Sequence, residues 1–504
     1  MRPYKCILAA IITLYLGLSA SAQPRPPYQL PYRPQLHFTP KAHWINDPNG
    51  MVFYKGTYHL FFQYYPDGTV WGPMHWGHAT SKDLVQWQEQ PIALYPDSLG
   101  YIFSGSAVID EQNTSGFGKP GNPAMVAIFT HHDPVEEKKG KGLHEYQSLA
   151  YSLDEGKTWT KYAGNPVIRN PGIPDFRDPK VMWHESSHRW IMTLATKDRI
   201  TFYSSPNLKD WTRESEFGAA VGAHGGVWEC PDLFTLEHEG NQKWVLIVNI
   251  NPGGPNGGSA TQYFVGGFDG HTFTADDQAT RWLDYGPDEY AGITWSNTGK
   301  RRIFLGWMSN WDYADRVPTG TWRGAMTIPR ELGLVRTGEG YRVISQPVAE
   351  LMKSGRMLVR QRDIAKKDYQ LVRPGILREP YALSVNSAGK QDFSIRLSNP
   401  AGEELLVGYD KKSNEYYIDR SRAGKSDFVK NFARRHVAPR MAQGGVINLT
   451  LVVDVASVEL FADGGLTTMT STFFPTSLLG QVQVSSPAPW KADIQVTGFK
   501  SIWK

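Results

Sequence analysis

The chain has 504 residues, more than one ordinary domain holds, and its 49 Gly and 34 Pro are scattered along the whole length. That composition favours a turn-rich, all-β protein with two domains over a helical or disordered chain. The formal net charge of +4 is not gathered into a basic stripe, and the sequence contains no nucleic-acid-binding motif, so we expect no nucleic acid partner.

The first 22 residues are typical of a secretory signal peptide. Arg2 and Lys5 precede an apolar run from residue 7 to 18, and small residues follow at positions 20 to 22. The run is shorter than the ~20 residues that span a bilayer, so we expect cleavage and no membrane insertion of the mature chain. Cys6 would leave with this segment and Cys230 would remain alone, which excludes an intramolecular disulfide. We therefore expect an exported protein, periplasmic or secreted.

Residues 36 to 345 repeat one theme, in which a short apolar strand, a tight polar turn and an aromatic-rich strand follow one another. Three such hairpins occupy residues 51–63, 181–194 and 233–248. Each comes shortly after an Asp that lies beside a Pro: Asp47-Pro48, Asp178-Pro179 and Pro231-Asp232. Repeated antiparallel units of this size predict a β-propeller, in which the start of each inner strand points at a central axis.

The pattern changes near residue 346. Residues 346–357 predict a short linking helix or turn, and the later segments alternate apolar and polar residues as half-buried strands do. These strands predict a C-terminal β-sandwich. We therefore divide this all-β chain into a signal peptide (1–22), a propeller (23–345), a linker (346–362) and a sandwich (363–504).

Three carboxylates stand out in the propeller repeats: Asp47 in WINDPNG, Asp178 in FRDP and Glu229 in WECPD. An Asp before a Pro is usually a turn former that caps its own backbone. The occurrence of these acids at matching places of three repeats favours a shared site instead. Hydrolysis of a glycosidic bond requires such a set, because one carboxylate attacks or stabilises the cationic sugar and one carboxylic acid protonates the leaving oxygen. Glu229 is flanked by a Trp and a Cys, an apolar setting that favours its protonated form.

Two histidine patterns need to be weighed as metal sites. Residues 184–188 match the zinc-protease pattern HExxH, which works only on a helix, whereas here they lie between two strand-like runs. His75 and His78 have strand spacing, and such residues are more often structural hydrogen-bonding groups than ligands. We therefore expect no metal and no organic cofactor.

Eight motifs, in this order, resemble those of glycoside hydrolase family 32, which contains invertases, levanases, inulinases and exo-fructanases. They are WINDPNG, FFQYYP, WGHATSKDLVQW, FSGSA, FRDPKV, ECPDLF, GWMSNW and VELFADGG. The similarity extends from His37 to the C-terminal strands. One departure is Tyr65, where relatives often have Asn in a QYNP motif, and it concerns the rim beyond the first fructose.

The resemblance implies a five-bladed propeller that carries the active site, a C-terminal β-sandwich, and retaining hydrolysis of β-fructofuranosides. It implies that Asp47 is the nucleophile, Glu229 the acid/base and Asp178 the stabiliser of the transition state. It further implies that the fructose pocket is lined by Asn46, Gln63, Trp71, Phe103, Ser104, Arg177 and Trp311.

The main expectation is an exo-acting fructan β-fructosidase that releases fructose from levan, inulin or sucrose. An endo-levanase or endo-inulinase is the nearest alternative, because the height of the loops around the pocket decides between exo and endo action. A fructosyltransferase would use the same carboxylates with a sugar acceptor, and a non-catalytic carbohydrate-binding propeller would lack at least one of them. The sequence leaves the preferred linkage and the oligomeric state open.

Overall fold

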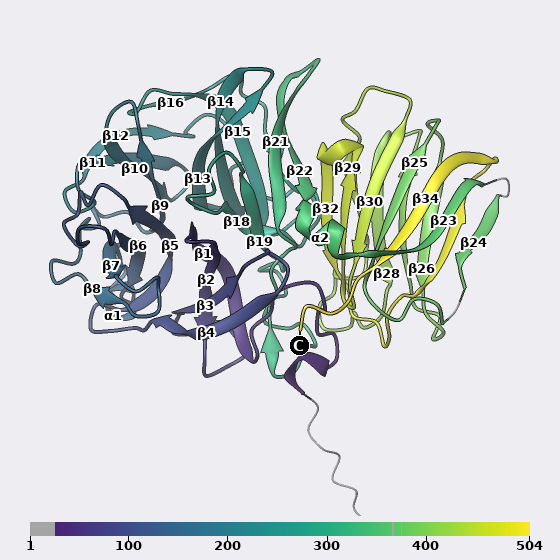
Figure 1. Ribbon diagram of the computed structural model, residues 1–504, viewed down its shortest axis with the longest axis horizontal. Helices are drawn as coiled ribbons and strands as arrows, with labels where there is room; N and C mark the ends of the chain where they lie inside the picture. The colour runs from purple at the N-terminus through teal and green to yellow at the C-terminus, as the bar shows by residue number, and fades with distance from the viewer. Residues whose placement is uncertain (1–25, 365–366, 374, 504) are drawn as a thin grey trace, which may run out of the picture.

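The computed structural model describes residues 26–364, 367–373 and 375–503. The predicted signal peptide lies outside these residues. Strands dominate the structure and form two parts that lie side by side, a ring of sheets built by the N-terminal two thirds and a pair of sheets built by the rest (Figure 1). Among the described helices, none is long and apolar enough to cross a membrane.

Five sheets form the blades of a propeller, and within each blade successive strands pair antiparallel. The blades, each from its innermost strand outward, are β1 (His43–Tyr54), β2 (Thr57–Tyr65), β3 (His75–Ser81) and β4 (Trp87–Leu94); β5 (Tyr101–Asp110), β6 (Ala124–His132), β7 (Glu145–Ser152) and β8 (Thr160–Lys161); β9 (Phe176–His184), β10 (Arg189–Thr196), β11 (Ile200–Ser205) and β12 (Thr212–Phe217); β13 (Val227–His238), β14 (Asn241–Asn251), β15 (Ala260–Phe268) and β16 (Phe273–Ala275), with β17 (Arg281–Trp282) on β15; and β18 (Tyr290–Thr294), β19 (Ile303–Trp307), β21 (Arg330–Thr337) and β22 (Gly340–Pro347).

The innermost strands close a ring. β1, β5, β9, β13 and β18 contact one another in turn, and β18 contacts β1. β20 (Trp322–Arg323) adds a short parallel pairing to the start of β1. Hydrophobic clusters fill the interfaces between neighbouring blades, and the cluster between the first two holds Phe61, Trp76 and Phe129. This burial of apolar faces between blades is what holds the ring together.

Each innermost strand carries a β-bulge in which two residues oppose one residue of the next strand. The bulged pairs are Asn46-Asp47, Phe103-Ser104, Asp178-Pro179, Cys230-Pro231 and Ala291-Gly292. A bulge takes a residue out of the ladder and re-aims its side chain, and Pro suits such a place because it has no N–H to donate. The Asp and Pro repeats of the sequence therefore mark bulges in the inner strands, and the interpretation of these residues as simple turn formers does not apply.

The C-terminal part consists of two six-stranded sheets around one large hydrophobic core, as a β-sandwich does. One sheet has the order β23 (Arg356–Ile364), β34 (Trp490–Gly498), β25 (Tyr381–Ser387), β30 (Ile447–Val453), β31 (Ser457–Ala462) and β32 (Thr467–Thr472). The other has the order β24 (Asp368–Val372), β33 (Gln481–Ser485), β26 (Phe393–Ser398), β27 (Glu404–Asp410), β28 (Glu415–Arg422) and β29 (Arg435–Pro439). Short helices are η1 (Pro27–Gln29), α1 (Pro134–Glu137), α2 (Ala349–Ser354) and η2 (Asp463–Gly465).

The connection between the two parts is shorter than the linker that we drew from the sequence. β22 ends at Pro347, and the helix α2 follows it directly. β23 begins at Arg356 and pairs with β34, so residues 356–362 form a sandwich strand and not linker. The polar and basic composition of β23 hid it, because its side chains are mostly exposed or half-buried and show no clean alternation.

Buried ion pairs join the sandwich to the propeller. The guanidinium of Arg330, on β21, donates to Asp284 at 2.9 Å and to Glu459 of β31 at 3.0 Å, and all three side chains are fully buried. His37 adds a second contact to Glu459 at 2.8 Å. Because unpaired charges are costly in such an environment, this network fixes the two parts against each other.

Candidate active site

The three carboxylates that the sequence singled out lie on neighbouring inner strands, at or beside the bulges. Asp47 is the second residue of the bulge in β1, and Asp178 is the first residue of the bulge in β9. Glu229 lies directly before the bulge in β13. The sequence-based view that they occupy matching positions of the repeat is therefore wrong in register. The side chains nevertheless meet, because the bulges present different residues of each strand to the same space.

Asp47 is half-buried and surrounded by hydrogen-bond donors. Ser104 Oγ donates to its Oδ2 at 2.7 Å, and Asn46 Nδ2 donates to its Oδ1 at 2.9 Å. The thiol of Cys230 lies 3.5 Å from Oδ2. These contacts orient the carboxylate, and they place two of the predicted pocket residues beside it.

Asp178 is almost completely buried, with 5% of its surface exposed. The backbone N–H of Cys230 donates to its Oδ2 at 3.0 Å. Its backbone φ of 64° lies in the left-handed region, which a non-glycine residue adopts only at a cost. Burial, with a smaller contribution from the carboxylates of Glu229 and Asp47, raises the pKa of Asp178 to about 8 against the opposing effect of Arg177.

Glu229 is held by two partners. Arg177 donates from Nε to its Oε1 at 3.1 Å, with Nη2 at 3.0 Å from the same oxygen, and the hydroxyl of Tyr290 donates to Oε2. Burial raises the pKa of Glu229 above its ordinary value, against the opposing effects of Arg177 and the Tyr290 hydrogen bond. Since these carboxyls also repel one another, the cluster retains protons that isolated carboxyls would lose.

Arg177 is itself fixed by carboxylates behind it. Its Nη1 donates to Asp175 at 2.7 Å and to Glu145 at 3.1 Å, and Glu145 also accepts the backbone N–H of Phe176 at 2.7 Å. A guanidinium that bridges several carboxylates in this way has little freedom to move. It therefore holds Glu229 at a defined position relative to Asp47.

The other predicted pocket residues come from several elements, since Phe103 lies on the inner strand β5, Gln63 on β2 and Trp71 in the connection between β2 and β3. Gln63 opposes the first bulge and is buried, and its Nε2 has no partner among the described residues. Phe103 stacks on His132 with a centroid separation of 4.3 Å, and exposed Trp71 meets Phe103 edge-on at 6.0 Å. Together they provide one polar and one aromatic side to the space in front of Asp47.

Trp311 lies on the first-blade and fifth-blade side of the ring. Its ring is 4.9 Å from that of Trp307 and 5.9 Å from that of Trp44, and the backbone N–H of Trp311 donates to Ser259 Oγ at 3.1 Å. The side chain is half-buried, so part of the indole is available to form a wall.

Three residues of the cluster escaped the sequence analysis as site residues: Tyr290, Glu145 and Cys230. Tyr290 directly precedes the fifth-blade bulge, as Glu229 precedes the bulge of the fourth blade. An alignment of all five inner strands would therefore have identified Tyr290 as a candidate site residue. Cys230 acts through its backbone N–H, which carries no sequence signal. Glu145 contacts Arg177 across blades, and nothing in the local sequence predicts such a pairing.

The histidine patterns do not form the metal sites that their spacing suggests. His184 ends β9 and bonds Ser187 within the hairpin turn, so the HExxH residues lie on no helix. His78 pairs with His59 at 3.1 Å, and His75 bonds the carbonyl of Pro73. In the part of the chain that the structure describes, one other group, His132, His144 and Glu145, brings its ligand atoms within 4.8 Å of one another. Glu145 of that group already accepts a hydrogen bond from Arg177.

Comparison with known proteins agrees with this geometry. Residues 37–347 match the glycosyl hydrolases family 32 N-terminal domain, and residues 366–499 match the C-terminal domain of the same family. The chain belongs to glycosyl hydrolase family 32. It is therefore a glycoside hydrolase, and its two structural parts correspond to the two domains of that family.

The chain is 46% identical to a levanase from Bacillus subtilis, over 94% of this chain and 71% of the levanase. It is 40% identical to the extracellular exo-inulinase inuE of Aspergillus ficuum, over 93% of this chain and 94% of that protein. The crystal structure of exo-inulinase from Aspergillus awamori superposes with a TM-score of 0.86 at 38% identity, and covers 94% of this chain and 100% of its own. A β-fructofuranosidase from Schwanniomyces occidentalis complexed with fructosyl-erythritol gives a TM-score of 0.85 at 34% identity, over 94% and 98% of the two chains.

Proposed function

We propose that this protein is an exported, retaining β-fructofuranosidase that removes terminal fructose from fructans such as levan and inulin, and from sucrose. The observation that carries the proposal is the cluster around Cys230, whose thiol lies 3.5 Å from Oδ2 of both Asp47 and Asp178 and whose neighbour in sequence is Glu229. Relatives named levanase, exo-inulinase and β-fructofuranosidase, at 34% to 46% identity, support the substrate class.

In the first step, Asp47 attacks the anomeric carbon of the bound fructose while Glu229 donates its proton to the leaving glycosidic oxygen. The bond from carbon to the leaving oxygen breaks as the bond to Asp47 forms, through an oxocarbenium-like transition state. Asp47 suits this role because its oxygens are oriented by Ser104 and Asn46. Glu229 suits the acid role because its burial favours the protonated form.

In the second step, Glu229 is ionised and takes a proton from water, whose oxygen attacks the anomeric carbon as the bond to Asp47 breaks. Two displacements at one carbon retain its configuration. Arg177 and Tyr290 both donate to Glu229, so they stabilise its ionised form between the two steps. Burial therefore favours the protonated Glu229 that the first step needs, and these two hydrogen bonds favour the ionised Glu229 that the second step needs.

In its ionised form, Asp178 accepts hydrogen bonds from the hydroxyls of fructose and balances the positive charge that develops on the ring. Its buried position and its fixed contact to the Cys230 N–H mean that this acceptor needs little reorganisation when the sugar binds. Gln63 supplies to the same pocket an amide N–H donor that has no acceptor among the described residues. Trp71, Phe103 and Trp311 provide the apolar faces against which a sugar ring packs.

Export is the other part of the proposal. The N-terminal 22 residues have the composition of a secretory signal, and relatives named extracellular exo-inulinase support the same destination. Long fructans do not cross membranes freely, so an enzyme that cleaves them must reach them outside the cytoplasmic membrane.

Product analysis tests the proposal. The purified protein is incubated with levan, inulin and sucrose beside Asp47→Asn, Glu229→Gln and the exposed control Glu239→Gln. Fructose as the sole product from the fructans, abolished by the first two variants and retained by the control, is the expected result. A ladder of oligosaccharides would replace exo with endo action, and fructose-extended products would favour a transferase. Failure to cleave any of the three would overturn the assignment.

A further inference from the structure

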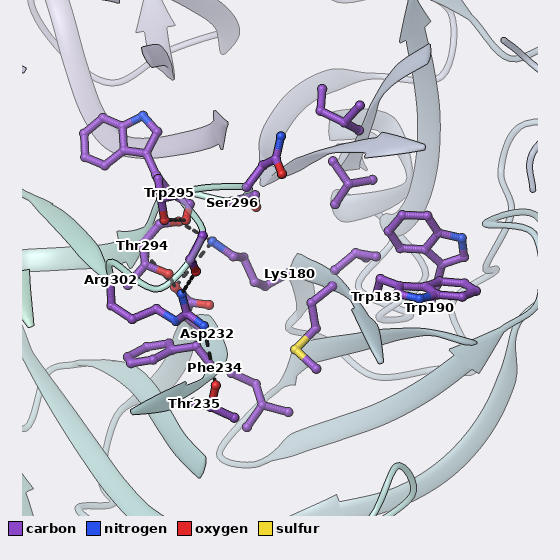
Figure 2. A pocket seen from close by; sticks show the side chains of 18 of the residues that line it. Lys180, Trp183, Trp190, Asp232, Phe234, Thr235, Thr294, Trp295, Ser296 and Arg302 are labelled. Carbon is purple, nitrogen blue, oxygen red and sulfur yellow. Dashed lines mark hydrogen bonds and ion pairs between the residues drawn. The ribbon is translucent and has the colours of Figure 1, made fainter. Parts of the chain in front are cut away.

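A second pocket lies farther along the inner strands than the carboxylate cluster. It is a cavity of about 490 Å³, a size that ordinarily accommodates small ligands. Its walls include Lys180, two residues after Asp178 on β9, and Asp232, two residues after Cys230 on β13. We call it the far-mouth pocket. It is defined by the residues drawn in Figure 2.

The two pockets share strands but not space. Between them lies a void of about 10 Å³, too small for a sugar, whose lining includes three prolines that lie in the bulges or directly after one. These are Pro48, Pro179 and Pro231. A molecule in the far-mouth pocket therefore occupies a site of its own and does not extend the catalytic pocket.

One side of the far-mouth pocket holds an unsatisfied acceptor. Asp232 is 1% exposed, and its Oδ2 accepts from the N–H and hydroxyl of Thr294 at 2.6 and 2.7 Å and lies 3.3 Å from Lys180 Nζ. Its Oδ1 has no hydrogen-bond partner among the described residues. A buried carboxylate oxygen without a donor is costly, so this atom favours an occupant that brings a hydroxyl or N–H.

The charges around the pocket balance. Lys180 is paired with Asp232, and Arg302 is held by the carbonyls of Gly299 and Arg301, with Thr235 at 3.4 Å. The carboxylate of exposed Glu185 completes the lining. Two cations and two anions leave no net charge to attract an ionic ligand, which favours a neutral polar occupant.

The opposite side is aromatic. Trp183 and Trp190 lie together across the pocket from Asp232 and Arg302 (Figure 2), with ring centroids 5.2 Å apart and an edge-to-face angle of 68°. The indole N–H of half-buried Trp183 has no acceptor in the described part of the chain. A sugar has an apolar C–H face and a polar edge of hydroxyls, and this pocket offers a matching surface to each.

We propose that the far-mouth pocket is a second, non-catalytic carbohydrate site that binds one or two residues of a neutral oligosaccharide. The choice of a fructan oligosaccharide as its ligand rests on the function proposed above. No pair of free carboxyls faces the ligand here, since Asp232 is engaged by Thr294 and Lys180. The site therefore binds the sugar and leaves it intact. On a long polymer, binding at two places raises the effective concentration of chain ends near the active site.

Binding stoichiometry tests the proposal. Isothermal titration of the catalytically impaired Glu229→Gln protein with 1-kestose, a neutral trisaccharide of one glucose and two fructose residues, should give two sites per chain. Adding Trp183→Ala should remove one site and leave the other with unchanged affinity. Trp183→Leu, which keeps side-chain bulk, serves as the second variant, and Trp211→Ala, at a half-buried indole outside the pocket, is the control. Thermal unfolding of each variant confirms that it is folded.

The active protein provides an independent readout. Trp183→Ala should leave kcat/KM for sucrose within about twofold of the original value and lower the rate on dilute levan or inulin several-fold. A single site in Glu229→Gln that Trp183→Ala does not affect would overturn the proposal. If the original protein cleaves fructans but the Glu229→Gln protein binds 1-kestose at one site only, the far-mouth proposal alone fails. If it cleaves no fructan, the proposed function fails first.

Discussion

The backbone N–H of Cys230 donates to Oδ2 of Asp178 at 3.0 Å, so the third and fourth blades are joined by a hydrogen bond inside the carboxylate cluster. The same cysteine places its thiol 3.5 Å from Asp178 and from Asp47. Burial, with the nearby carboxylates, raises the pKa of this thiol well above its usual range. Cys230 therefore acts as a structural centre of the cluster and not as a nucleophile.

The first prediction follows from that role. Native protein should resist alkylation of Cys230 by iodoacetamide at pH 7 to 8, because the thiol is buried and protonated, whereas the urea-unfolded chain should react fully. Mass spectrometry of the peptide containing residue 230 measures both. Cys230→Ala keeps the backbone donor, so we expect it to retain activity within about tenfold. Rapid alkylation of the folded protein with loss of activity would contradict this account.

A second prediction concerns the partner of Glu229. The Tyr290 hydroxyl stabilises the ionised carboxylate and so lowers its pKa; removing the hydroxyl in Tyr290→Phe should raise that pKa. The acid form then persists to higher pH, and the alkaline limb of the kcat/KM profile should move upward. Tyr203→Phe, at a tyrosine of the third blade without contact to the cluster, should leave the profile in place. A limb that stays fixed or moves downward in Tyr290→Phe would exclude Glu229 as the group that controls it.

A third prediction concerns Arg177. The planar guanidinium reaches Glu229, Glu145 and Asp175 at once, and a lysine cannot reproduce that fork although it keeps the charge. Arg177→Lys should lower kcat on sucrose by about 10²-fold with a folded protein, because a misplaced acid/base slows both steps. Steady-state kinetics with circular dichroism would check it. Full activity in Arg177→Lys would mean that charge alone suffices.

A fourth prediction concerns stability against pH. Burial, with Asp284 nearby, raises the pKa of Glu289 to about 8 in the folded protein. A carboxyl whose pKa is higher in the folded than in the unfolded state contributes stability at low pH, and that contribution is lost as pH rises toward 8. Glu289→Gln should therefore flatten the fall in Tm between pH 5 and 8, while the exposed Glu239→Gln should not. Parallel falls for Glu289→Gln and the original protein would show that another group is responsible.

A fifth prediction concerns the joint between the two domains. Replacing Arg330 by Met removes the cation that Asp284 and Glu459 share and leaves Glu459 its contact to His37, and breaking such a buried pair costs about 3 to 5 kcal/mol. Urea unfolding should show that loss. The exposed Arg356→Met, on β23, should change stability little. A cost below about 1 kcal/mol for Arg330→Met would mean that the hydrophobic contacts of the interface suffice on their own.

Local patterns in the sequence were sufficient to find the repeats and the three carboxylates, because Asp-Pro and the aromatic hairpins are short-range features. They were insufficient to place these residues in register. Asp178 and Glu229 differ by one position relative to their bulges, and a bulge is visible only when strand pairing is known. Tyr290 and Glu145 reach the cluster from strands far away in sequence, so no local pattern predicts them. The edge strand β23 was assigned to the linker because most of its side chains are exposed or half-buried, so its sequence lacks the alternation of apolar and polar residues that predicts a strand.

The stereochemistry of transfer tests the central claim, that Asp47 and Glu229 carry out two successive displacements at one carbon. Sucrose is incubated with the protein in water containing methanol, and the methyl fructofuranoside formed is assigned by NMR, since a glycoside does not mutarotate. A retaining enzyme must give methyl β-D-fructofuranoside, and Asp47→Asn must give none. Formation of the α-anomer would mean a single displacement, with Asp47 as a base or bystander, and would contradict the mechanism.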